Sequence, residues 1–297
     1  MERSDLLRKI NTFPLVASTL AEDLLSGDFR SVFRGEGIEF EEVRNYEQGD
    51  DVRAIDRNVS ARFGKPYVKL YREERELTVY VVLDCSASMF AGAAGDPKNS
   101  MTRYDQAVLT AALFGFSAEQ AGQRFGAIFF DSAPRKIFRA RKGRSHTMAI
   151  ISLALQAKPL AKGSALSAAI AGAGHLLKRR SLVVLISDFL CSGWEKELGR
   201  LSVKHDFIAI RIVDPLDNEI PNIGLVNIED PETGKTISAG TGFASFRNAW
   251  RTCQAERTAV WHSLCKRRQT AALELSTTRD AFTVLRNFFQ GRRDHHA

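Results

Sequence analysis

The sequence predicts an α/β protein with a doubly wound, mostly parallel β-sheet and a small antiparallel β subdomain. Two segments, 76–84 and 181–188, are largely apolar until they end in oxygen-bearing side chains. Such runs are expected of strands that are buried on both faces of a parallel sheet. Segments with apolar residues at helical spacing, such as 102–122, alternate with these strands along the chain. That alternation is typical of βαβ units, which build parallel sheets.

The same patterns assign the remaining elements in order. Residues 4–28 predict one or two amphipathic helices, and alternating apolar and charged residues predict half-exposed strands over 37–46 and 66–74. The other expected elements are strands at 125–130, 207–213 and 273–276, a hairpin at 225–238, and helices at 145–157, 164–179, 194–203, 243–269 and 280–289.

These elements divide the chain into two expected regions. Residues 1–75 are expected to form N-terminal helices and a β-rich leader that pairs with a hairpin within 222–240. Residues 76–290 are expected to form the α/β domain, into which this hairpin is inserted. Asp51 and Ser164 are expected to cap the helical segments that follow them, because Asp and Ser side chains accept hydrogen bonds from the first free amides of a helix.

Composition narrows the class of protein. The 297 residues carry a formal net charge of +7, and a basic surface favours acidic proteins, nucleic acid or anionic membranes without selecting among them. The four cysteines have no metal-type spacing, which favours a reducing, cytoplasmic location. The N-terminus lacks the apolar core of a signal peptide, and no apolar run approaches the roughly 20 residues that cross a bilayer.

The strand over 76–84 ends in a cluster of oxygen donors, Asp84, Ser86 and Ser88. Alternate residues of a turning loop can point the same way, so one carboxylate and two hydroxyls converge. Neutral hydroxyl ligands leave Mg²⁺ much of its charge and some open coordination positions. A calcium-binding EF-hand is excluded, because its sixth and twelfth positions would be Met89 and Gly95. A serine-capped turn without metal explains this one motif equally well.

Two further loops favour the metal site. The strand over 181–188 ends in Ser187 and Asp188, and a glycine turn over 162–167 carries the hydroxyl of Ser164. In an open parallel sheet, the carboxyl ends of the strands line one crevice where the strand order reverses. We therefore expect the three loops to meet and to bind Mg²⁺, with Mn²⁺ or Ca²⁺ as alternatives.

This set of residues resembles the metal-ion-dependent adhesion site of the von Willebrand factor A fold. The resemblance implies that Asp84, Ser86 and Ser88 form the first loop, that Ser164 replaces the usual Thr, and that Asp188 is the last ligand. The leader adds the motifs Arg44-Asn45-Tyr46, Gly49–Asp56, Ser60-Ala61-Arg62 and Arg72–Glu76. The combined pattern, over roughly residues 30–290, resembles the family of unknown function fifty-eight that is linked to MoxR-type AAA+ ATPases. Arg57 stands where that family has Trp.

The expected function is Mg²⁺-dependent protein binding rather than catalysis, because the three loops contain no histidine that could act as a general base. The resemblance implies an accessory or adaptor role with a MoxR-type AAA+ ATPase in remodelling or maturing protein complexes, with an acidic partner side chain completing the metal's coordination. Two alternatives stay open. One is a metal-dependent phosphoester hydrolase. The other is a nucleic-acid-binding protein that uses the basic run 135–144. A simpler explanation of this run is a solvated edge strand, whose Lys and Arg side chains discourage pairing with other sheets.

Overall fold

A computed structural model of the protein describes residues 3–26, 38–47, 50–52, 55–73, 77–91, 101–159 and 163–294. The chain forms two compact units. The main domain comprises Met1–Arg30 with Leu77–Ala297, and the leader comprises Ser31–Glu76. Parts of the sequence motifs, namely Gly49, Arg53, residues 74–76 and Lys162, lie outside the described residues.

The main domain is built on one sheet whose described strands have the order β10-β7-β6-β3-β4-β5. The strands are β3 (Thr78–Asp84), β4 (Arg124–Phe130), β5 (Pro134–Arg141), β6 (Leu182–Ser187), β7 (Asp206–Val213) and β10 (Ala271–Ser276). All pair in parallel except β5, which pairs antiparallel with β4 at one edge. The chain builds the sheet from β3 toward β5 and then from β6 toward β10. The strand order therefore reverses between β3 and β6, which is where ligands bind in such sheets.

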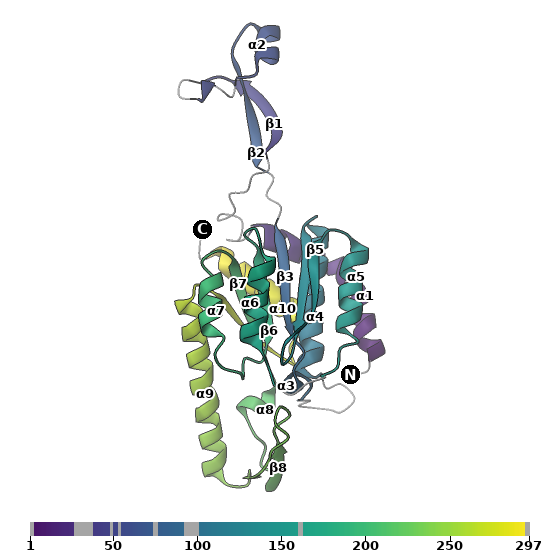
Figure 1. The fold of residues 1–297 in the computed structure, drawn as a ribbon, viewed down its shortest axis with the longest axis vertical. Coiled ribbons are helices and arrows are strands. Elements are labelled where there is room, and N and C mark those ends of the chain that lie inside the picture. Colours follow the sequence, from purple (N-terminus) through teal and green to yellow (C-terminus); the bar gives the residue numbers. More distant parts are fainter. Residues whose placement is uncertain are drawn as a thin grey trace. The chain divides into compact units, whose positions relative to one another are not determined.

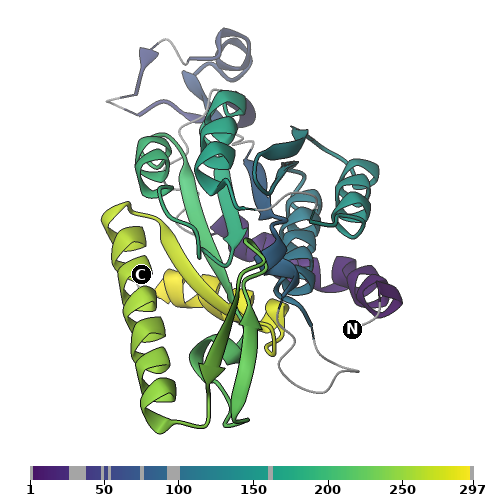
Figure 2. The ribbon, with the colours of Figure 1, turned by 60° about the horizontal axis from the view of Figure 1, so that its bottom comes forward.

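Helices cover both faces of this sheet (Figures 1 and 2). On one face α4 (Arg103–Gln120) contacts β3 and packs against α1 (Arg3–Ser26), α5 (Arg144–Ala154) and α10 (Ala281–Asp294). On the other face, α6 (Leu166–Leu176), α7 (Glu195–Leu201) and α9 (Ala244–Arg267) share an apolar core with Tyr80 and Val82 of β3. The doubly wound, mostly parallel α/β fold expected from the sequence is thus confirmed.

Local chemistry fixes the ends and spacing of the central elements. Helix α4 begins at a capping box in which Thr102 and Asp105 satisfy each other's backbone amides. After α4 the chain turns through Gly122 at φ +66°, a left-handed conformation that glycine adopts without strain. Gly126 on β4 lies against Tyr80, since a Cβ there would be 2.5 Å from the ring atom Cε1. The central strands are therefore packed too closely to accept a side chain at that position.

Helix α1 belongs to the main domain. Its buried side chains, Leu6, Ile10, Phe13, Ala17 and Leu20, recur at helical spacing, and the helix contacts α4. The sequence-based boundary at residue 75 grouped this helix with the leader, whereas the structure groups it with the main domain. The reason is this apolar stripe, which is buried against the main domain.

The leader contains an antiparallel pair, β1 (Ile38–Asn45) and β2 (Tyr67–Glu73), and the short helix α2 (Arg57–Phe63). Asp56 caps α2, because its carboxylate accepts hydrogen bonds from the amides of Asn58, at 2.9 Å, and Val59, at 3.2 Å. The sequence-based expectation that Asp51 caps this segment was wrong. Asp56 directly precedes the helix, which is the position that a capping side chain requires.

The expected hairpin is present as β8 (Leu225–Glu229) and β9 (Thr236–Gly240). It follows the short helix α8 (Pro215–Asn218) and precedes α9. In the described parts of the chain, β8 pairs only with β9 and β1 only with β2, so the hairpin and the leader form separate two-stranded sheets. The expected pairing between leader and hairpin stays a prediction.

Candidate metal centre

Three loops bring oxygen donors together at the carboxyl ends of β3 and β6. Asp84 is the last residue of β3, and its Oδ1 accepts a hydrogen bond from the Ser86 amide at 2.9 Å. This bond turns the chain at once into the short helix α3 (Ala87–Phe90). The hydroxyl oxygens of Ser86 and Ser88 then lie 3.2 Å apart, so they point into the same small space.

The second carboxylate oxygen of Asp84 forms hydrogen bonds with the other two loops. Its Oδ2 accepts hydrogen bonds from the hydroxyl of Ser187, at 2.6 Å, and from the hydroxyl of Ser164, at 3.3 Å. Ser187 ends β6, and Ser164 precedes α6. The serine was expected to cap that helix, but the cap position belongs to Ala165 and makes no side-chain cap bond. Ser164 instead turns its hydroxyl toward Asp84.

Asp188 follows directly after β6 and is buried, with 4% of its surface exposed. Its Oδ1 accepts a hydrogen bond from the Leu190 amide at 3.0 Å, while its buried Oδ2 has no hydrogen-bond partner. The next residue, Phe189, has φ +54°, an unfavourable backbone conformation for a residue with a side chain. Its ring packs against Trp194, with 5.2 Å between ring centroids, and this packing helps to hold the loop in place.

The two carboxyl groups are buried close enough to affect each other. Burial, and then the negative charge of Asp188, raise the pKa of Asp84 to about 7, although hydrogen bonds from Ser187 and Ser86 oppose the rise. Burial also raises the pKa of Asp188, against hydrogen bonds and the positive charge of Arg103. Because two ionised carboxylates are costly in such a place, a cation bound among these loops would stabilise the charged form of both.

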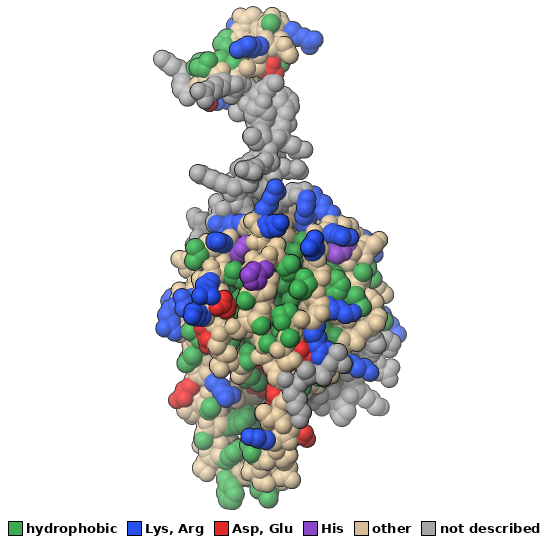
Figure 3. Space-filling view, in the orientation of Figure 1, with side chains coloured by type: hydrophobic (Ala, Val, Ile, Leu, Met, Phe, Trp, Pro, Cys, Tyr) green, Lys and Arg blue, Asp and Glu red, His purple; other side chains and the backbone are tan. Residues whose placement is uncertain are grey.

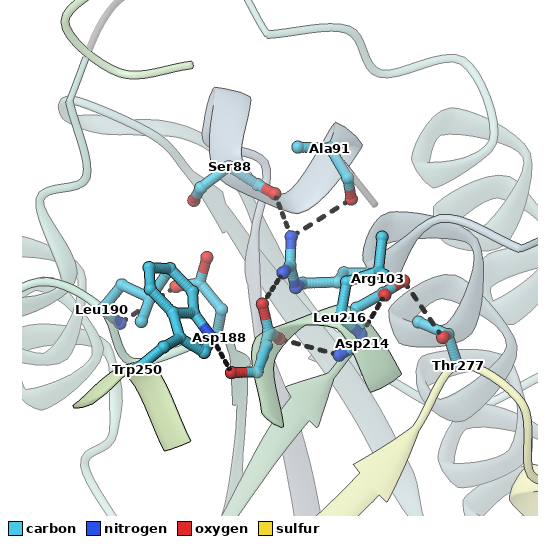
Figure 4. A network of polar contacts seen from close by, with 10 residues as sticks. Ser88, Ala91, Arg103, Asp188, Leu190, Asp214, Leu216, Trp250 and Thr277 are labelled. Carbon is cyan, nitrogen blue, oxygen red and sulfur yellow. Dashed lines mark hydrogen bonds and ion pairs between the residues drawn. The ribbon is translucent and has the colours of Figure 1, made fainter. Parts of the chain in front are cut away.

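A buried arginine supports the first loop from below (Figure 4). Arg103, at the start of α4, donates hydrogen bonds to the carbonyl oxygens of Ser88, at 3.1 Å, and Ala91, at 3.2 Å, and forms an ion pair with Asp217 of α8. The backbone carbonyl of Asp217 in turn accepts a hydrogen bond from the Trp250 indole at 2.7 Å. The first loop is therefore tied to α4, α8 and α9.

The β8–β9 hairpin also reaches the site. Glu232, in the turn of the hairpin, accepts hydrogen bonds from the Ser88 amide at 2.8 Å and from the Gly163 amide at 2.6 Å. Its two carboxylate oxygens thus bridge the first and second loops. Figure 1 shows β8 and α8 at the same end of the main domain as α3.

The residues fit a hard divalent cation. The donors that meet here, Asp84, Ser86, Ser88, Ser164 and Asp188, all carry oxygen ligands, which Mg²⁺ prefers. Asp188 supplies a buried carboxylate oxygen without a protein partner. The described residues contain no group of three or more His, Cys, Asp or Glu side chains that could hold a metal. A metal at this site would therefore depend on the serine hydroxyls.

The sequence-based site residues come together, and three contributors were missed. Ser187 was noted only as a strand end, yet it makes the shortest hydrogen bond to Asp84. Arg103 carries no motif, and only its place at the first turn of a helix after the loop could have drawn attention to it. Glu232 lies in a hairpin turn far along the chain, and no local pattern marks it. Asp214, directly after β7, caps α8, because its carboxylate accepts a hydrogen bond from the Leu216 amide at 2.9 Å.

Fold and site together define a doubly wound α/β domain with oxygen donors at the point where the strand order reverses. The family model for the protein of unknown function DUF58 matches residues 42–260, and the chain belongs to that family.

The chain is also similar to several relatives and solved structures. An uncharacterized protein of Mycobacterium tuberculosis is 32% identical over 287 residues, covering 96% of this chain and 89% of the relative. The conserved hypothetical protein BatB from Bacteroides thetaiotaomicron is 15% identical, with a TM-score of 0.48 over 73% of this chain and 99% of that one. The VWA domain of SpRpn10 is 10% identical, with a TM-score of 0.40 over 73% and 95%. Among the described helices, none is long and apolar enough to cross a membrane.

Proposed function

We propose that this protein is a Mg²⁺-dependent protein-binding module. The observation that carries the proposal is the convergence of three loops on Asp84, with a second buried carboxylate, Asp188, that has an oxygen without a hydrogen-bond partner. A cation bound between the carboxylates and the hydroxyls stabilises the buried negative charges of such an arrangement.

The donor set favours binding over catalysis. Ser86, Ser88 and Ser164 would hold the metal through neutral hydroxyls, while Asp84 and Asp188 balance its charge. A bound Mg²⁺ then keeps enough positive charge to attract a carboxylate from outside the chain. We therefore propose an acidic side chain of a partner protein as the group that the metal recognises.

The phosphoester-hydrolase alternative needs a general acid or base beside the metal, and the loops supply no histidine for this role. The nucleic-acid alternative relies on the basic run 135–144. Most of that run is β5, an edge strand of alternating exposure, where charged side chains discourage pairing with other sheets. In Figure 3 many Lys and Arg side chains of the main domain lie at the end away from the β8–β9 hairpin. We therefore favour protein binding.

The family resemblance supports a proposal for the partner. We propose that the protein acts in the cytoplasm as an adaptor for a MoxR-type AAA+ ATPase, which remodels or matures protein complexes. The free thiols of Cys85, Cys191, Cys253 and Cys265 are consistent with a reducing compartment.

Metal binding is tested first, by calorimetric titration of Mg²⁺ and Mn²⁺ into purified protein. Wild type should bind one ion, Asp188→Asn should lose binding, and Glu229→Gln, which removes an exposed charge on the hairpin, should match wild type. If wild type and Asp188→Asn bind the ions equally, the proposed site is wrong.

Partner binding is tested by affinity capture from native lysate in Mg²⁺ and in EDTA. The proposal expects an AAA+ ATPase to be held by wild type in Mg²⁺ alone. Three captures are compared: wild type in Mg²⁺, wild type in EDTA, and Asp188→Asn in Mg²⁺. If all three hold the same proteins, the metal does not mediate binding.

A further inference from the structure

The hairpin turn places one carboxylate on the rim of the proposed metal site. Residues 229–231 and 233–238 are exposed, yet Glu232 between them is partly buried. Its carboxylate accepts hydrogen bonds from the amides of Ser88, at 2.8 Å, and Gly163, at 2.6 Å. Ser88 itself carries a proposed ligand hydroxyl, and Gly163 directly precedes another, that of Ser164. Glu232 therefore contacts the backbone of two loops that hold the metal ligands.

The turn is built to present this side chain. The carboxylate of Asp230 accepts hydrogen bonds from the Glu232 amide, at 2.9 Å, and from the Thr233 hydroxyl, at 2.6 Å. The Gly234 amide donates to the Asp230 carbonyl at 2.7 Å, and Gly234 has φ +71°, which suits glycine. These bonds hold the turn without using the Glu232 side chain, whose carboxylate remains available to the loops.

The rest of the hairpin is weakly anchored. It is a two-stranded sheet on its own, and two of its large side chains are open to solvent, with 76% of Leu225 and 63% of Ile237 exposed. An isolated hairpin has little stability of its own, so the contact that Glu232 makes is one that a competitor can replace.

We propose that Glu232 occupies the position at which an acidic side chain of a partner reaches the metal site, so that the hairpin is a displaceable cover. This inference rests on the proposed function, since it assumes that a carboxylate is the group that the site binds. A partner must displace Glu232 before it binds, which lowers the apparent affinity of the covered protein. If nine of ten molecules are covered, removing the cover raises the apparent affinity about ten-fold.

The test uses a dicarboxylate, glutarate, as the probe. It is titrated into the Mg²⁺-loaded full chain, comparing wild type with Glu232→Gln, Glu232→Ala and the control Glu229→Gln. Glu229→Gln removes the same charge from the same hairpin at an exposed position. Glutarate should bind both Glu232 variants about ten-fold more tightly than wild type or the control. Equal glutarate affinity in all four proteins would overturn the proposal.

Hydrogen exchange gives a readout that does not depend on the metal. Peptides that contain the amides of Ser88 and Gly163 should exchange faster in Glu232→Ala than in wild type, with and without Mg²⁺, while Glu229→Gln should leave them unchanged. If Mg²⁺ fails to bind wild type, the proposed function and the cover both fall. If Mg²⁺ binds wild type but glutarate binds all four proteins equally, the cover alone is refuted.

Discussion

Raising the pH should destabilise the metal-free protein and strengthen its binding of Mg²⁺. The cause is Asp84, whose carboxyl has a pKa of about 7 in the folded chain instead of 3.8. Between about pH 4 and pH 7 the unfolded chain ionises this group while the folded chain keeps its proton, so the free energy of unfolding falls as pH rises. Above about pH 7 both states are ionised and the loss is complete.

The size of the effect follows from the two pKa values. The difference between 3.8 and about 7 corresponds to about 4 kcal/mol of unfolding free energy. Metal binding acts in the opposite direction, because Mg²⁺ requires the ionised carboxylate. Below about pH 7 its apparent affinity should rise about ten-fold per pH unit for each proton released, and above that pH it should level off.

Urea unfolding in EDTA, from about pH 5 to about pH 8, measures the first effect, and calorimetric titration of Mg²⁺ measures the second. Asp84→Asn is the control, since the amide has the same shape and does not titrate. The difference in unfolding free energy between wild type and this variant reports Asp84 and its interaction with Asp188, and it removes the contribution of distant groups such as His205, whose pKa is lowered by burial. Equal pH dependence of stability in both proteins, or a Mg²⁺ affinity that is constant over this range, would refute the reasoning.

Three further predictions concern stability and surface charge. Arg103→Met should lower the free energy of unfolding in urea by about 3 kcal/mol and weaken Mg²⁺ binding, because the ion pair and the loop contacts are lost. If the variant keeps the stability and the Mg²⁺ affinity of wild type, Arg103 does not support the loop. Gly126→Ala should lower the unfolding free energy by about 1–3 kcal/mol through its clash with Tyr80, whereas Gly172→Ala, in a helix with room for a Cβ, should not; equal thermal shifts would contradict this packing. Arg139→Gln should leave Mg²⁺ affinity unchanged, and loss of tight nucleic-acid binding at physiological salt in this variant would favour the nucleic-acid alternative.

The central sheet could be predicted because its signal is local. Strands β3 and β6 are apolar along their length and end in polar residues, so pattern alone locates them and places Asp84 and Asp188 at their ends. Adjacency of the two strands then follows from the general rule for open α/β sheets. That is why the residues expected to bind the metal lie around one place in the fold, whereas their role as ligands stays a prediction.

The remaining features depend on contacts between distant segments. Glu232 lies in a turn whose sequence explains only the turn itself, and its contact with Ser88 spans 144 residues. Helix α1 was expected as a helix, but its place in the main domain depends on which surface buries its apolar face. Ser164 illustrates a competition that sequence cannot decide, since the same hydroxyl suits a helix cap or a bond to Asp84.

The separation of the site's parts along the chain has a consequence for how the molecule matures. The hydrogen bond from Ser187 to Asp84 joins residues 103 positions apart. Contacts of such long range are made only after a large loop has closed, and they are expected to form slowly. A partly folded or interrupted chain therefore cannot bring the residues of the proposed metal site together. The proposed recognition of a partner would then be a property of the finished molecule alone, and a newly made chain would not bind that partner until its central strands had paired.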